Sequence, residues 1–360
     1  MRFFRAGWIR GAVLAAAFLL LMLLFAHLGP LRIIALLAEL GASFPVVVLL
    51  FACHECTRAA ALSRCFHDGE RPPFAQLLRV RLLGEALGTL TRTGAFAAEP
   101  ARVVLLAGQT GLGAGAYAAA LAELVANSSV SAGVTLLVAG FVLVSGMPGA
   151  AEPLKGPLLA LTQVLWWGSL VYLSAVAVAL TTAVRPVSAV ARGIARLATR
   201  ASCARKNDGG AGRLRSIEDA VLVILARRSR ARVQLVLFEC LAQSILIVEI
   251  YWIVAAMGVR TRLGGALFLE VLMKAPNLVQ FMGVTEAGYA VIFNWFGVTA
   301  AVGFALSLVK LLRTVVVAGV GLGLLNRLAR IAPAFLVRAP DPCPRVVTPT
   351  SSSRYLDASP

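Results

Sequence analysis

The stretch TLTRTGAFAAEPAR, residues 89–102, decides how the rest of the chain is interpreted. It places Arg92, Glu99 and Arg102 beside a glycine and a proline in an otherwise apolar neighbourhood. Charges at membrane depth are costly, so they usually face a protein interior or a wet cavity and mark a substrate or ion pathway. Glycine and proline favour an interrupted helix, which at that depth is tolerated only inside protein or along a cavity. The stretch therefore predicts a broken, charged hairpin within a membrane.

The composition of the chain supports a membrane setting. Of the 360 residues, 59% are hydrophobic and 14% are charged, and the mean hydropathy is +0.84. These values lie outside the range of soluble globular domains. A net charge of +17 would suggest nucleic acid in a soluble protein, but here the excess lies in loops that flank apolar runs, as the positive-inside rule requires. We expect a polytopic membrane protein that binds no nucleic acid.

The cysteines predict neither a disulfide framework nor a metal centre. Cys53, Cys56, Cys65 and His67 form a C-x2-C-x8-C-x-H run that imitates a zinc site. The first pair lies in an apolar helix, without the loop that a structural zinc site needs. We interpret these cysteines as small apolar residues packed at a helix end, and we expect no metal and no cofactor.

A related interrupted stretch lies near the other end of the chain. KAPNLVQFMGVTEAG, residues 274–288, places Pro276 and Gly283 beside Glu286, again between apolar runs. Two such segments in opposite halves of a membrane chain point to the substrate site of an inverted-repeat transporter. We expect the first hairpin to open to the cytoplasm and the second to the outside. We also expect Glu99 and Glu286 to meet in one polar chamber.

Apolar runs of sufficient length predict six full crossings beside the two re-entrant hairpins. The predicted fold class is thus an all-α polytopic membrane protein with an inverted-repeat-like arrangement. Residues 32–40 are too short to cross and are expected at the outer interface. Length alone would also allow two spans instead of one within residues 103–146. The crossings that we prefer cover residues 11–28, 43–62, 109–144, 158–184, 233–257 and 298–325.

The distribution of lysine and arginine predicts the orientation. Residues 185–232 carry twelve basic and three acidic side chains, which is typical of a cytoplasmic loop. Within this loop SIEDAVLVILARRS predicts an amphipathic helix, which either lies on anionic lipid or serves as a connector. The loop joins residues 1–184 and 233–325 of one membrane domain, 1–325, and residues 326–360 form a cytoplasmic, largely disordered tail.

Charged residues of both halves make up the predicted substrate site. Lys310 and Arg313 would attract a phosphate, and Glu99 and Glu286 an amine or a proton. A purely structural role, in which buried ion pairs fix the register of helices, is the alternative. Pairing alone would not require broken helices, whose exposed ends bind ions. The candidate substrate-binding residues are Glu85, Arg92, Glu99, Arg102, Glu286, Lys310 and Arg313.

Two stretches resemble signatures of a known family. LRVRLLGEALGTLTRTGAFAAEPARVVLL and FMGVTEAGYAVIFNWFGVTAAVGFALSLVKLLRTVVVAGVGLGLL look like those of the lysylphosphatidylglycerol synthase transmembrane-region family, also called flippase-like membrane proteins. The likeness covers about residues 43–325. It implies lipid translocation, with Glu99 and Arg102 as the acid and base of the first hairpin and Glu286 as the acid of the second. No domain of enzymatic size follows Leu325, so we expect no synthase activity.

These features together predict a lipid translocase of a bacterial inner membrane that is not an enzyme. Its partner would be a phospholipid or another polar lipid, and no phosphate-binding loop is present to supply energy from a nucleotide. One alternative is a scaffold that holds enzymes of lipid synthesis, such as hopanoid synthesis, at the membrane through the basic loop. Another is an intramembrane lipid transferase that uses His67, Asp68 or Glu99.

Overall fold

Helices dominate the structure. A computed structural model of the protein describes Leu19 and residues 22–66, 70–91, 95–110, 114–145, 152–182, 217–225, 229–279 and 283–331, and within these ranges it contains no strand. Five stretches are long and apolar enough to cross a membrane: Pro30–Ser63, Gly115–Ser145, Lys155–Thr182, Arg230–Ala256 and Ala300–Val320. The protein is therefore an all-α polytopic membrane protein, as its composition predicts.

The order of the helices matches most of the predicted crossings. Five of the six overlap the candidate spans. Of the first, residues 11–28, the structure describes only residue 19 and residues 22–28, which are helical, so the count of six stays a prediction. Most of the basic loop and residues 332–360 of the tail also lie outside the described residues, whereas residues 326–331 belong to the last described helix and not to a disordered tail. The elements are α2 (Pro30–Leu40), the 3-10 turn η1 (Gly41–Ser43), α3 (Phe44–Ser63), α4 (Phe74–Thr91), α5 (Ala95–Thr110), α6 (Ala114–Ser145), α7 (Glu152–Thr182), α10 (Ser229–Ala256), α11 (Leu263–Val279), α12 (Val284–Trp295) and α13 (Ala300–Ile331).

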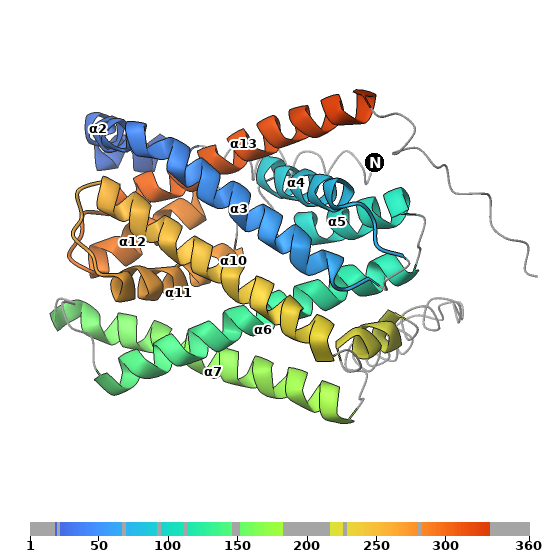
Figure 1. The fold of residues 1–360 in the computed structure, drawn as a ribbon. Coiled ribbons are helices and arrows are strands. Elements are labelled where there is room, and N and C mark those ends of the chain that lie inside the picture. Colours follow the sequence, from blue (N-terminus) through green and yellow to red (C-terminus); the bar gives the residue numbers. More distant parts are fainter. Residues whose placement is uncertain are drawn as a thin grey trace, which may run out of the picture.

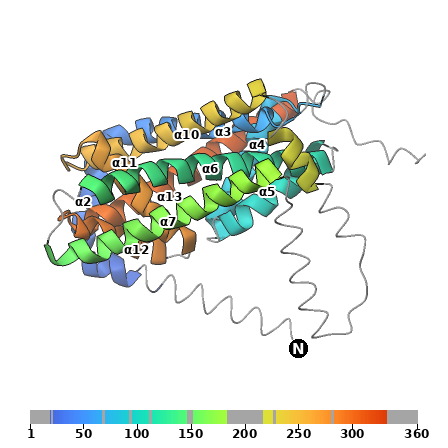
Figure 2. The same ribbon diagram turned by 90° about the horizontal axis from the view of Figure 1, so that it is seen from below.

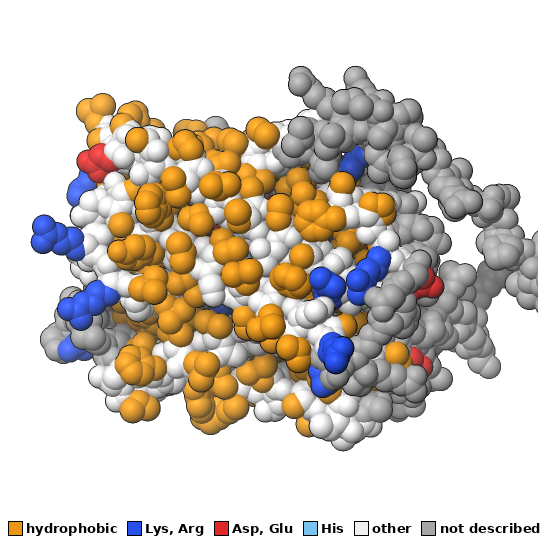
Figure 3. Space-filling view, in the orientation of Figure 1, with side chains coloured by type: hydrophobic (Ala, Val, Ile, Leu, Met, Phe, Trp, Pro, Cys, Tyr) orange, Lys and Arg blue, Asp and Glu red, His pale blue; other side chains and the backbone are white. Residues whose placement is uncertain are grey.

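The long helices run from one end of the bundle to the other (Figures 1 and 2). Figure 3 shows charged side chains toward the two ends of one face, with hydrophobic side chains over the zone between them. Large apolar side chains on the bundle surface are strongly exposed, among them Leu137 and Phe141 of α6 and Trp167 and Val171 of α7. Such a band suits contact with lipid chains, so the membrane normal runs along the long helices.

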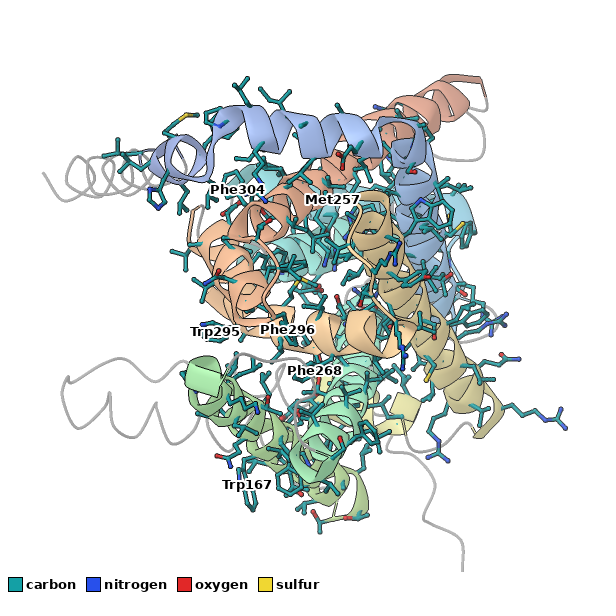
Figure 4. All side chains as sticks on the ribbon, turned by 90° about the vertical axis from the view of Figure 1, so that its left-hand side faces the viewer. Trp167, Met257, Phe268, Trp295, Phe296 and Phe304 are labelled. Carbon is teal, nitrogen blue, oxygen red and sulfur yellow. The ribbon has the colours of Figure 1, made fainter. Side chains whose placement is uncertain are left out.

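Helix α2 lies across the end of α3 instead of continuing it (Figures 1 and 4). The turn η1 separates the two helices. Ile33 and Leu40 are buried, while Leu31 and Ile34 are exposed. A helix of 11 residues spans about 17 Å, well short of a hydrocarbon core of about 30 Å. This placement agrees with the interfacial position predicted for residues 32–40.

Two pairs of short helices lie toward opposite ends of the bundle (Figures 1 and 2). Helix α4 packs against α5, and α11 packs against α12. Helix α12 has 12 residues and spans only about 18 Å, too little to cross. The two helix pairs thus lie at opposite ends of the bundle, and the side of the membrane to which each opens stays a prediction. Helix α6 continues without a break over its 32 residues, so a single long helix follows the first hairpin.

The second arm of each hairpin is a helix, α5 in the first hairpin and α12 in the second. The sequence predicts where α12 begins more closely than where α5 begins. Helix α12 follows Gly283, whose φ of 83° favours glycine, as the Gly-x-x-Glu turn implied. For α5, the preference of proline for the first turn of a helix predicts a start at Ala97, but the helix begins at Ala95, so Pro100 lies inside it. A proline close to a helix start removes only one hydrogen bond, which allows the helix to begin earlier.

Glycines bring α11, α12 and α13 close together. A Cβ on Gly303 would overlap the carbonyl oxygen of Tyr289, and one on Gly288 would lie 2.6 Å from Cγ of Pro276. Small residues let membrane helices approach closely. Phe268 and Phe296 meet edge to face beside these contacts, with ring centroids 5.5 Å apart (Figure 4). The second hairpin is therefore a tightly packed part of the core.

The described part of the basic loop packs on the bundle. Residues 217–225 are helical, as the amphipathic pattern predicts. Leu225 is buried in one cluster with Leu62 and Leu235, and Val221 and Ile224 pack against it. The apolar stripe of this helix thus covers helix ends of the bundle itself.

Candidate functional site

Buried ion pairs connect α3, α4, α6 and α10 in the interior of the bundle. Arg81 donates from Nη1 to Oε1 of Glu123 at 2.9 Å and from Nε to Oε2 of Glu55 at 3.2 Å. Arg58 donates from Nη2 to the same Glu123 oxygen at 2.6 Å. Its Nε lies 3.7 Å from Oε2 of Glu239. We call Glu55, Arg58, Arg81, Glu123 and Glu239 the central cluster.

Every member of the central cluster is less than a tenth exposed, and Glu239 and Arg81 are 0% and 1% exposed. A buried charge costs several kcal/mol unless it is paired. The ion pairs between helices offset part of this desolvation cost. The cluster nevertheless sets three carboxylates against two guanidinium groups, so one negative charge has no counterpart among its members.

The first hairpin adds a second group of ion pairs. Arg102 of α5 pairs with Glu99 of its own helix, and its Nη2 donates to Oε2 of Glu85 on α4 at 2.6 Å. Arg102 is buried, whereas the carboxylate side chains of Glu85 and Glu99 are 31% and 21% exposed. A Cβ on Gly84 would overlap the Arg102 side chain, so a glycine here gives Arg102 room. We call Glu85, Glu99 and Arg102 the hairpin trio.

A small pocket lies between the central cluster and the hairpin trio. Its space suffices for roughly one water molecule. The charged part of its wall consists of two arginines and two glutamates, and the remainder is apolar. The lining residues are Arg81, Glu123, Glu99 and Arg102 on the charged side and Leu62, Val80, Leu106 and Ala120 on the apolar side.

Helix α13 brings Arg313 to the same region. Arg313 pairs with Glu249 of α10, and its guanidinium carbon lies 4.2 Å from the ring centroid of Phe51 on α3. The charges of Glu85 and Glu55 also act on Arg313. Although Arg313 follows the second hairpin in the chain, it therefore faces the charges of the first half.

The end of the bundle that holds α11 and α12 has a separate polar group. Nζ of Lys310 lies 3.6 Å from Oε2 of Glu270. Lys274 donates to the carbonyl oxygen of Ser131 and to Oγ1 of Thr135, each at 3.1 Å. The same Nζ of Lys310 lies 5.6 Å from the ring centroid of Tyr289 on α12. These lysines thus contact neighbours on α6, α11 and α12, and Glu270 is the carboxylate among these contacts.

The carboxylate of Glu286 caps the start of its own helix, α12. Its Oε2 accepts a hydrogen bond from the backbone N–H of Gly283 at 2.7 Å, and the residue is 3% exposed. Helix α12 packs mainly against α11, α13 and α7, whereas α5 packs mainly against α4 and α6. Glu286 and Glu99 therefore lie in different parts of the bundle, and the described contacts do not bring them into one chamber.

The predicted site residues are thus divided between two places. Glu85, Glu99, Arg102 and Arg313 lie in or beside the ionic region of the first hairpin, while Lys310 and Glu286 belong to the other end. Arg92 lies outside the described residues. That these side chains bind a substrate stays a prediction.

Sequence reasoning missed the central cluster. His54, Glu55 and Arg58 lie in the last turns of the second predicted span, which favours their placement at the inner membrane surface. That prediction is wrong, because α3 packs along α10 and all three side chains are buried. Nδ1 of His54 lies 3.1 Å from the carbonyl oxygen of Ala242 on that helix. A signal did exist: Glu123 is the only charged residue within 103–146, and Glu239 lies inside an apolar span.

The cysteines do not gather into one site. Cys53 is exposed, Cys56 is partly exposed and Cys65 is buried. Within the described ranges no three His, Cys, Asp or Glu side chains are placed to hold a metal ion. His67 and Asp68, which the transferase interpretation needs, lie outside those ranges.

Comparison with known proteins found no family model, no curated protein and no solved structure that matches this chain. The resemblance to the lysylphosphatidylglycerol synthase transmembrane-region family therefore rests on the quoted motifs alone.

Proposed function

We propose that this protein is a non-enzymatic lipid translocase of a bacterial inner membrane, which binds a charged lipid headgroup beside the hairpin of α4 and α5. The pocket between the central cluster and the hairpin trio carries this proposal, because its lining is half charged and half apolar. An amphiphile needs both kinds of surface, and binding sites combine an apolar wall with a few convergent polar groups. The motif resemblance points in the same direction.

The charges of the pocket suit a headgroup that carries a phosphate. Arg81 and Arg102 are lining residues of the pocket, and a guanidinium group released from its carboxylate would bind phosphate in a two-pronged fashion. Glu99 and Glu123 line the same pocket and would accept hydrogen bonds from an amine or hydroxyl of the headgroup. A headgroup that replaces these internal ion pairs would leave few charges unpaired.

Displacement of α5 is the movement that this function requires, because the closed pocket holds only about one water molecule. Helix α5 packs mainly on α4 and α6, and Val104 on its outer side is 61% exposed. A shift of α5 away from α6 would break the contacts of Arg102 and open the pocket sideways. Acyl chains could then stay in the surrounding lipid while the headgroup enters.

Transfer of a headgroup-labelled phospholipid in proteoliposomes tests the proposal. Glu99→Gln and Arg102→Gln each remove a charged hydrogen-bond partner worth about 1.5–3 kcal/mol, so we expect lipid movement to fall about ten- to hundredfold. Glu39→Gln, an exposed position on α2, is the matched control and should move lipid at the wild-type rate. Equal rates in all three variants would contradict the proposed site, and a chemically altered lipid would contradict a non-enzymatic function.

A further inference from the structure

The excess carboxylate of the central cluster has no solvent to stabilise it. In the hairpin trio two carboxylates also face one arginine, but both are partly exposed and water can stabilise the additional charge. In the central cluster three carboxylates face two arginines, and all five side chains are buried. A buried group in this situation takes up a proton and becomes neutral.

Glu239 is the least engaged carboxylate of the central cluster. Glu123 accepts hydrogen bonds from Arg58 and Arg81 at 2.6 and 2.9 Å, and Glu55 accepts one from Arg81 at 3.2 Å. No arginine, amide or backbone donor among the described residues reaches a side-chain oxygen of Glu239 within hydrogen-bond distance, although the residue is 0% exposed. The hydrogen-bond contact of Glu239 is with the carboxyl group of Glu123, and two carboxyl groups can share a hydrogen bond only when one of them carries a proton. Its contact with Nε of Arg58, at 3.7 Å, is longer than a hydrogen bond.

The neighbours of Glu239 leave its charge uncompensated. The charged groups that act on it are Arg58 of α3, Glu123 of α6 and Arg81 of α4, and both arginines already serve other carboxylates. Helix α10 also packs against α11, α13 and α2. The charged groups of these helices are engaged elsewhere or exposed. Arg313 pairs with Glu249, and Lys310 faces Glu270. Lys274 is bound to Thr135, and Arg32 and Glu39 are exposed.

His54 is the other group that could hold a proton here. Its Nδ1 contacts the carbonyl oxygen of Ala242, and its Nε2 lies 3.7 Å from Oε1 of Glu55. Glu55 is already bound to Arg81, so a proton on His54 would be separated from Glu239 by that pair. Geometry therefore favours Glu239, whose contact with Arg58 is longer than a hydrogen bond, over the imidazole.

We infer that Glu239 holds a proton in the closed state and that its release and uptake couple lipid movement to the proton gradient. The coupling rests on the proposed function, whereas the bound proton does not. A proton adds to the carboxylate to form a carboxylic acid, and the reverse step returns it to water. Glu123 joins Glu239 to the pocket, because it lines the pocket and shares Arg58 with Glu239.

Infrared spectroscopy of the full chain in lipid nanodiscs tests the bound proton. Wild type should show the C=O band of a buried carboxylic acid at neutral pH, and Glu239→Gln should lack it. Glu270→Gln, which removes a buried carboxylate at the other end of the bundle, should keep the band. Glu123→Gln leaves two carboxylates, Glu55 and Glu239, for the two arginines. Glu239 should then be ionised, so the band should be absent although the Glu239 side chain is still present. A missing band in wild type, or a band that survives in Glu239→Gln, would overturn the assignment.

Proteoliposomes with an imposed pH difference test the coupling. In wild type the gradient should accelerate lipid movement severalfold, and in Glu239→Gln the rate should be the same with and without the gradient. A gradient response that survives in Glu239→Gln would overturn the coupling. The coupling would also be overturned if wild type moved lipid equally fast at all pH gradients, and in that case the proposed function would stand. Wild type that moves no lipid at all would instead remove the proposed function, while the infrared result would still decide the bound proton.

Discussion

The two hairpins are built from similar sequence and hold together in different ways. Both place a glycine, a proline and a glutamate between apolar runs. In the hairpin of α4 and α5, Arg102 pairs with Glu85 and Glu99 across the two arms. In the hairpin of α11 and α12, Glu286 serves its own helix start, and the arms meet through Gly288 and Pro276. One hairpin is joined by charges and the other by close packing.

This difference separates two roles that a glutamate can play in a broken membrane helix. A carboxylate at the first turn stabilises the exposed N–H groups and the positive end of the helix dipole, which is what Glu286 does. A carboxylate that faces another helix requires a cation from that helix, as Glu85 does with Arg102. Only the second kind of glutamate changes partners when the helices move. The first hairpin is therefore the better candidate for a moving element.

The largest expected effect comes from removal of a buried arginine at the ionic end. Arg81→Met would leave Glu55 without its cation and Glu123 with only one, which should cost about 3–5 kcal/mol in the free energy of unfolding. Lys310→Met, at the other end, removes the cation that faces one buried carboxylate, Glu270, and should cost less, about 1–3 kcal/mol. Denaturant unfolding in mixed micelles measures both values. Equal losses would contradict the conclusion that ion pairs stabilise the end with the central cluster more than the end with α11 and α12.

A smaller effect is expected from alanine at two helix contacts. Gly303→Ala meets the Tyr289 backbone, which cannot yield easily, so it should lower the free energy of unfolding by about 1–3 kcal/mol. Gly84→Ala meets only the Arg102 side chain, so it should reduce lipid movement more than stability. Gly133→Ala, with nothing within 4 Å of the added Cβ, is the control and should change neither. If Gly84→Ala destabilised as much as Gly303→Ala, the role of Arg102 as a movable group would be refuted.

The smallest effect is expected for Glu286→Gln. The amide oxygen can still accept the Gly283 hydrogen bond, so the loss at the helix start is the attraction between charge and helix dipole, about 0.3–1 kcal/mol. Thermal unfolding should shift slightly, and lipid movement should stay at the wild-type rate. Glu99→Gln removes an ion-pair partner of buried Arg102, so it should lower the free energy of unfolding more than Glu286→Gln does and should also slow lipid movement. A transport defect in Glu286→Gln as large as that in Glu99→Gln would restore Glu286 to the substrate site.

The sequence predicted the fold better than the arrangement of charges. The long apolar runs predicted five of the observed spans, and glycine and proline located both hairpins. The charges Glu55 and Arg58 were assigned to the membrane surface because periodicity shows which residues share a helix face, but not which neighbour covers that face. The neighbour is α10, which follows α3 in the chain by more than a hundred residues.

Composition and hydropathy by themselves determined that the chain is an all-α membrane protein with interrupted helices, because a bilayer admits few backbone arrangements. Which charges meet was decided only by tertiary structure. Arg81 selects Glu55 and Glu123 from two other helices, and among the described residues no arginine hydrogen-bonds to Glu239. Ion pairing depends on distances of a few ångströms between helices, and spacing along one helix carries no information about them.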